Sequence, residues 1–118
     1  MKKPKYYGTE TDLQRTIAKY LDMMGVLWNH SPNETMGTPA HYKKRASMGV
    51  KSGFPDVMIF EARKGFHGLA IELKVGRNKP TPAQLQWIEW LNERGYHAVW
   101  LNDLDEIIAK IDWYFENE

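Results

Sequence analysis

Two short segments of this sequence carry side chains that could do chemistry together. Asp56 follows a Gly-Phe-Pro turn and opens an apolar run, and Glu72 and Lys74 lie two positions apart inside a second apolar run. If the two runs form strands that pair as a hairpin, both carboxylates come within a few ångströms of each other. Two carboxylates that close repel each other unless a proton or a cation lies between them.

Such a cluster is suited to holding a metal ion beside a phosphodiester. Oxygen ligands without cysteine or paired histidine favour Mg²⁺ or Mn²⁺ over zinc. Lys74 next to the cluster could orient or help to deprotonate a water molecule and offset the charge that builds on a phosphate. The sequence therefore predicts a metal site that includes Asp56 and Glu72, with Lys74 beside it.

The same residues also allow plainer interpretations. In a strand, side chains two positions apart share a face, so Glu72 and Lys74 project together with Ala70, while Ile71 projects the other way. A buried unpaired charge is unfavourable, and a structural ion pair or a strand with one wet face would avoid it. For Asp56 the alternative is an Asx turn. The sequence alone leaves these alternatives open.

Glu10 is a third candidate acid. At 100° per residue, Glu10 and Gln14 lie on the same side of a predicted helix as the apolar Ile17. The carboxylate of Glu10 and the amide of Gln14 therefore continue the side of the helix that faces the core. The alternative is an acid that is stabilised by the positive end of the helix dipole. Gln84 also allows two interpretations. It could lie at the rim of the site, or it could only form a capping box with Thr81 at the start of a later helix.

The elements that must position these residues follow from periodicity, capping residues and turn residues. We expect helices over 9–24, 82–94 and 103–115, strands over 26–28, 57–60, 69–75 and 96–101, and a long loop over 31–52. The order α-β-loop-β-β-α-β-α predicts one α/β domain over 1–118, with a mixed sheet flanked by helices. Its core spans about 9–101, and 102–118 closes it.

Charge is distributed unevenly along the chain. Residues 1–81 carry 14 Lys and Arg against 7 Asp and Glu, whereas residues 82–118 carry 2 against 8. This pattern suits a polyanion-binding face opposite a solvated helix, or simply uneven surface charge. The predicted phosphate contacts are His41, Tyr42, Lys43, Lys44, Arg45, Lys51, Arg77 and Lys79. Ordinary solvated side chains are the alternative.

Composition excludes several classes of protein. The chain has no cysteine, which removes disulfides and thiolate zinc sites and fits a reducing compartment. No apolar run reaches the roughly 18 residues of a membrane span, and no apolar segment of a signal peptide follows the basic start. We therefore expect no membrane partner and a cytoplasmic location. None of the four histidines has the spacing of a metal-ligand pair.

Taken together, these motifs resemble the virus-type replication-repair nuclease (VRR-NUC) domain of the PD-(D/E)xK nuclease superfamily. The likeness starts at the helix that carries Glu10 and Gln14 and runs to the strand after Gly95, which is most of the chain. It rests on Gly-Phe-Pro-Asp at 53–56, on Glu-Leu-Lys at 72–74 and on the downstream Gln84. The resemblance implies a restriction-endonuclease-like fold and metal-dependent hydrolysis of phosphodiester bonds.

The resemblance also implies a role for each site residue. Asp56 and Glu72 would bind the metal directly, helped by the Leu73 carbonyl, and Glu10 would bind it directly or through water. Lys74 would orient the attacking water, and Gln84 would support Lys74 or the scissile phosphate. The implied cofactor is Mg²⁺, with Mn²⁺ able to substitute, and no small-molecule cofactor is expected.

Small stand-alone members of the family that this chain resembles, often from phages, can act as homodimers on four-way (Holliday) DNA junctions. We therefore expect a structure-selective DNA endonuclease, which in a phage would work in the cytoplasm of the bacterial host. Its cut would leave 5′-phosphate and 3′-hydroxyl ends. The alternatives are a less selective nickase or restriction-like enzyme, a catalytically silent nucleic-acid-binding module, and a structural or partner-binding α/β domain.

Overall fold

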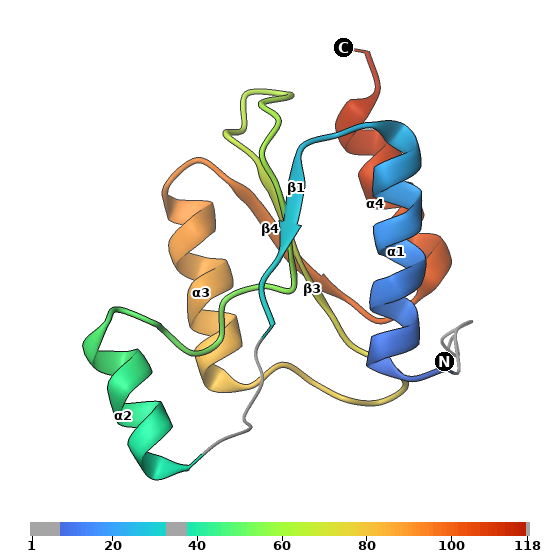
Figure 1. Ribbon diagram of the computed structural model, residues 1–118. Coiled ribbons are helices and arrows are strands. Elements are labelled where there is room, and N and C mark those ends of the chain that lie inside the picture. Colours follow the sequence, from blue (N-terminus) through green and yellow to red (C-terminus); the bar gives the residue numbers. More distant parts are fainter. Residues whose placement is uncertain (1–7, 33–37, 118) are drawn as a thin grey trace.

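The computed structural model describes residues 8–32 and 38–117 as four helices and four strands (Figure 1). In chain order they are α1 (Glu10–Met24), β1 (Trp28–His30), α2 (Pro39–Ser47), β2 (Val57–Ile59), β3 (Leu69–Leu73), α3 (Pro82–Glu93), β4 (His97–Leu101) and α4 (Leu104–Phe115). None of the helices in the described residues is both long and apolar enough to cross a membrane.

The four strands form one mixed sheet in the order β1-β2-β3-β4. The β1–β2 and β2–β3 pairs are antiparallel, and β3 and β4 are parallel because α3 crosses over between them. Strand β3 is central and buried at every position. The expected mixed α/β sheet with flanking helices is therefore confirmed.

The helices cover the two faces of the sheet unequally (Figure 1). Helices α1 and α4 lie side by side on one face, where Ile17 and Ile111 pack against Ile71 of β3 in the main core cluster. Helix α3 covers the other face, where Leu91 packs near Ala70 in a smaller cluster. The alternation along β3 thus sends odd-numbered side chains to the main core and even-numbered ones to the α3 face.

Local signals in the sequence explain where α1 and α3 begin. Thr9 caps α1 in a capping box with Asp12, and Gly25 ends it in the left-handed conformation, with φ of 72°. Thr81 caps α3, and Pro82 occupies the first helical position. Both helices therefore start where the capping residues predict, and their first turns lie at the same end of the sheet.

The prediction of a continuous loop over 31–52 is wrong, because Pro39–Ser47 forms α2. Thr38 caps this helix by accepting a hydrogen bond from the backbone of His41, and Pro39 starts it. Helix α2 contains no buried residue, so the sequence lacks the apolar period by which helices are recognised. The part of the predicted loop at 33–37 lies outside the described residues.

Strand boundaries differ from the predicted ones by one or two residues. Strand β1 begins at Trp28 rather than at residue 26, because its register with β2 pairs Trp28 with Ile59 and His30 with Val57. Strand β3 ends at Leu73, after which the Lys74 N–H bonds the carbonyl of Leu101. Pairing with neighbouring strands, which is not a local property, sets these limits.

Candidate active site

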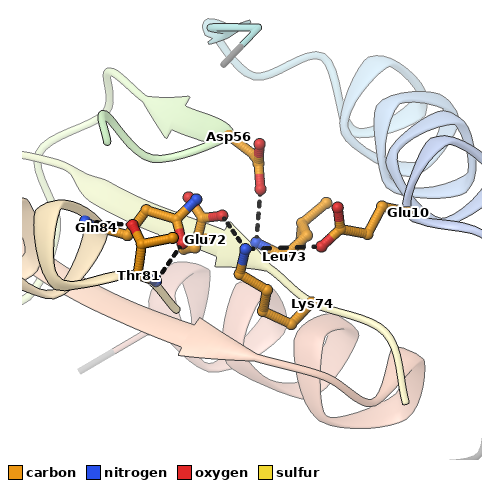
Figure 2. Close-up of polar contacts among 7 residues, drawn as sticks. All are labelled: Glu10, Asp56, Glu72, Leu73, Lys74, Thr81 and Gln84. Carbon is orange, nitrogen blue, oxygen red and sulfur yellow. Dashed lines mark hydrogen bonds and ion pairs between the residues drawn. The ribbon is translucent and has the colours of Figure 1, made fainter. Parts of the chain in front are cut away.

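Two carboxylates meet where β2 begins and β3 ends. The antiparallel register pairs Val57 with Ile71, so Asp56, one residue before β2, lies opposite Glu72. Both side chains belong to the α3 face of the sheet, because they alternate with core residues of the opposite face. The Leu73 N–H donates a hydrogen bond of 2.8 Å to Asp56 Oδ2 and fixes the direction of that carboxylate (Figure 2).

Glu72 is held in an environment that disfavours its charge. The residue is only 2% exposed, and its Oε1 is buried without a hydrogen-bond partner. Burial, followed by the nearby negative charge of Asp56, raises the pKa of Glu72 from 4.5 to about 8, although Lys74 partly opposes the shift. A cation between the two carboxylates would relieve this repulsion.

Lys74 lies between two acids (Figure 2). Its Nζ is 3.4 Å from Glu72 Oε2 and 3.8 Å from Glu10 Oε1, and its side chain is 10% exposed. Glu10, in the first turn of α1, remains 48% exposed and contacts the opposite side of the ammonium group. The structure therefore brings Glu10, Glu72 and Lys74 together, with the lysine separating the two glutamates.

These side chains line an open cavity of about 560 Å³. Residues from α1, β1, β3 and α3 contribute to its wall: Glu10, Thr11, Gln14, Arg15, His30, Pro32, Asp56, Glu72, Leu73, Lys74 and Gln84. All six residues predicted for catalysis or metal binding are among them. Sequence reasoning did not assign Thr11, Arg15 or Pro32 to the site, and no pattern in the sequence marks them.

Two further wall residues have polar atoms that bear on the site. Both amide atoms of Gln14 are buried without a hydrogen-bond partner; its place on the same helical stripe as Glu10 was the available signal. His30 Nδ1 donates to the carbonyl oxygen of Asp56 at 2.7 Å, because a carbonyl oxygen can only accept. His30 could be placed here only through the β1–β2 register.

Gln84 serves the helix and lines the cavity at once. Its Oε1 accepts a hydrogen bond of 2.8 Å from the Thr81 N–H, and the Gln84 N–H donates to Thr81 Oγ1 at 3.2 Å. The expected capping box is thus present (Figure 2). Because Oε1 is used in the cap, the Nε2 amide group is the part of Gln84 that can reach a bound group.

The segment before Asp56 is tied to α3 at three points. Gly53 has φ of +90°, and a Cβ there would lie 2.7 Å from the backbone of Ala83. Trp87 Nε1 donates to the Ser52 carbonyl at 3.0 Å, and the ring of Phe54 meets Trp87 edge-on at 5.0 Å. These contacts fix how the chain approaches Asp56, which explains the glycine in the Gly-Phe-Pro-Asp motif.

The predicted phosphate contacts divide into three places. Five of them lie on α2, namely His41, Tyr42, Lys43, Lys44 and Arg45, and Lys51 lies just after that helix. Arg77 and Lys79 are exposed in the connection between β3 and α3, where Lys79 lies over the Trp100 ring at 5.7 Å. Tyr42, Arg45 and Lys51 line a second hollow that adjoins the cavity, and none of the eight lines the cavity itself.

The donor set fits a magnesium-type cation. Within residues 8–32 and 38–117, no group of three or more His, Cys, Asp and Glu side chains is close enough to enclose a metal ion. Mg²⁺ does not require one, because it commonly keeps several waters and takes one or two protein carboxylates. Asp56 and Glu72, with a buried oxygen lacking a partner, supply such a pair.

Comparison with known proteins agrees with this geometry. The family model of the VRR-NUC domain matches residues 8–102. A solved structure described as a VRR-NUC domain protein is 33% identical, with a TM-score of 0.78 over 93% of this chain and 90% of that chain. A second, described as a VRR-NUC domain, is 20% identical with a TM-score of 0.62 over 92% and 100%, and supports the fold alone. None of the curated proteins is similar enough to match.

The family model covers most of the chain, and the residues that it spans include the whole cavity wall. The matching solved structure at 33% identity extends the likeness over nearly the full length of both chains. The chain therefore belongs to the VRR-NUC family of nucleases within the PD-(D/E)xK superfamily.

Proposed function

We propose that this protein is a Mg²⁺-dependent DNA endonuclease that also accepts Mn²⁺. The observation that carries the proposal is the meeting of Asp56 and Glu72 at the end of the sheet, with Lys74 Nζ 3.4 Å from Glu72. Two carboxylates that face each other beside a lysine ammonium group, in an open cavity, are suited to phosphodiester hydrolysis.

Asp56 and Glu72 would hold the metal, helped by the Leu73 carbonyl. The Leu73 N–H already faces Asp56, and in a strand the carbonyl of the same residue faces the same way. Glu10 would join through water, since Lys74 lies between it and Glu72. When bound, the metal supplies Lewis-acid activation of the phosphate and lowers the pKa of a coordinated water.

Lys74 would orient the attacking water and offset negative charge that develops on the phosphate. Its two carboxylate contacts keep the ammonium group in the cavity, where a fixed charge acts with little reorganisation. Gln84 would support the scissile phosphate or Lys74 through its Nε2 amide, because its Oε1 caps α3.

The DNA path would run from the cavity across α2 and the β3–α3 connection. Helix α2 and Lys51 supply positive charge, with Arg45 and Lys51 at the hollow that adjoins the cavity, and Arg77 and Lys79 add exposed positive charge in the connection that follows β3. These positive side chains would hold the backbone of a duplex through its phosphates.

We further propose that the enzyme acts as a homodimer on branched DNA such as four-way junctions, in the cytoplasm. The described residues of one domain form one candidate metal site, whereas symmetric cutting of a junction needs two, and a two-fold dimer supplies both. Cut ends would carry 5′-phosphate and 3′-hydroxyl groups. A less selective nickase remains the second candidate within the same chemistry.

A cleavage panel tests the proposal. Four-way junctions, flaps, single strands and plain duplex are incubated with Mg²⁺, Mn²⁺ or EDTA, and product ends are mapped. We expect metal-dependent cutting that is fastest on branched DNA, and a rate about 10²–10⁴-fold lower for Lys74→Ala. Lys19→Ala, an exposed lysine of α1 outside the cavity wall, is the matched control and should cut like the wild type.

Three outcomes would contradict the proposal. Metal-independent cutting, or full activity in Lys74→Ala, would remove the assigned roles. Binding of DNA without any cutting under these conditions would favour the catalytically silent module. A mass measurement by light scattering with and without a junction tests the dimer separately.

A further inference from the structure

A second hollow, of about 530 Å³, adjoins the catalytic cavity. It lies between α2, the segment 50–54 and the first turn of α3. Pro32 and Gln84 line both spaces, so a strand bound at the carboxylates can continue directly into the hollow. Its volume is in the range of pockets that enclose a small ligand.

The walls of this hollow combine aromatic rings with positive charge. Tyr42 is 39% exposed, and the guanidinium of Arg45 lies 5.1 Å from the centre of its ring. Phe54 is held in place by its edge-on contact with Trp87, and Lys51 adds an ammonium group. Among the described residues that line the hollow there is no Asp or Glu.

Packing does not account for the position of α2. The helix has no buried residue, and a nine-residue helix without a packed face gains little stability from the rest of the fold. Its side chains Tyr42, Arg45 and Ala46 instead form one wall of the hollow. A bound group in the hollow would give α2 the contacts that the core does not supply.

We propose that this hollow holds one unpaired nucleotide of the DNA strand next to the cut. Its base would stack on Tyr42 between Arg45 and Phe54, and its phosphate would contact Lys51. Within a duplex, both faces of a base are covered by neighbouring base pairs, so only a base that has left the stack can take this place. The inference rests on the proposed nuclease function and adds the feature of the substrate that this chain reads.

The experiment compares binding of two DNA probes in EDTA, where metal-dependent cutting is absent. One probe is a fully paired duplex, and the other is the same duplex ending in a fork with a 2-aminopurine in the first unpaired position. Fluorescence anisotropy gives Kd for each probe, and 2-aminopurine emission reports stacking of the unpaired base.

We expect Tyr42→Ala to weaken binding of the forked probe about 5- to 150-fold, the range for loss of one base–aromatic stack. Binding of the paired duplex should stay within about twofold. The quenching of 2-aminopurine that we expect with the wild type should be lost in Tyr42→Ala. Tyr42→Phe keeps the ring and should keep the quenching of 2-aminopurine. Thermal melting confirms that both variants are folded.

A matched pair of lysines separates this site from general phosphate binding. Lys51 lines the hollow and Lys44, on the same basic segment, does not, so Lys51→Ala should weaken the forked probe more than Lys44→Ala does. Equal losses on both probes for Tyr42→Ala, or no loss on either, would overturn the inference. Because no metal is present, failure of cleavage in the panel above would leave this result standing, and the reverse also holds.

Discussion

Replacing Glu72 with glutamine should make the metal-free protein more stable above neutral pH while abolishing cleavage. The carboxyl is 2% exposed, and burial and Asp56 raise its pKa from 4.5 to about 8. A carboxyl whose folded pKa is raised binds its proton more tightly in the native state than in the unfolded chain. The wild type therefore becomes less stable, with a falling free energy of unfolding, as pH rises from about 4.5 through about 8.

The size of this loss follows from the shift. Each unit of pKa displacement corresponds to about 1.4 kcal/mol, so the full displacement of the Glu72 pKa from 4.5 to about 8 is worth on the order of 5 kcal/mol at alkaline pH. Glutamine has nearly the same shape and no charge to bury. Its amide oxygen can still accept from Lys74, but the charge attraction is lost, so we expect a net gain on the order of 2 kcal/mol at pH 8.5.

Denaturant unfolding between pH 5 and pH 9, with EDTA present, measures the effect. The unfolding free energies of wild type and Glu72→Gln should be similar near pH 5 and diverge as pH rises. Glu89→Gln, an exposed acid of α3, is the control and should run parallel to the wild type. In a second series without EDTA, added Mg²⁺ should stabilise the wild type, by about 2.7 kcal/mol at a hundred times Kd, and not the variant. Parallel curves for Glu72→Gln and wild type would refute the reasoning.

Three further substitutions test how the fold positions the site. Gly53→Ala should lower the free energy of unfolding by about 2–4 kcal/mol and slow cleavage, because φ is +90° and the new Cβ would collide with the backbone of Ala83. Gly49→Ala is the control: φ is +98° there too, but no atom lies within 4 Å of the new Cβ, so the loss of free energy of unfolding should be smaller. Asn92→Ala should cost about 1–3 kcal/mol in denaturant unfolding, since its side chain bonds both backbone groups of Ala98. Ile71→Ala, at a fully buried position, should cost about 2–5 kcal/mol, and a loss below 1 kcal/mol would contradict the assigned core.

Much of the site could be predicted because its geometry is local or depends on one hairpin. Alternation along 69–75 separates Glu72 and Lys74 from the main core, and the structure shows this separation. Antiparallel pairing of two adjacent strands then places Asp56 opposite Glu72. A helical stripe placed Glu10 on the inner side of α1, and it lies 3.8 Å from Lys74.

The missed features depend on contacts between distant segments or on the absence of burial. His30 reaches the site only because β1 pairs with β2 in a particular register. Gln14 joins the cavity only because α1 packs on one face of the sheet, which brings its first turns next to the carboxylates. Helix α2 was not predicted, because a helix is recognised from apolar residues that recur along its buried face, and α2 has no buried residue.

The central claim is that Asp56 and Glu72 together hold a divalent cation, and titration calorimetry with Mg²⁺ at pH 7 tests it most directly. The account predicts saturable binding to the wild type, with release of a proton because Glu72 must ionise from a pKa of about 8. That release makes the measured heat depend on the ionisation enthalpy of the buffer. Asp56→Asn should bind no Mg²⁺ over the same range. Equal binding by wild type and Asp56→Asn, or no binding by either, would contradict the account.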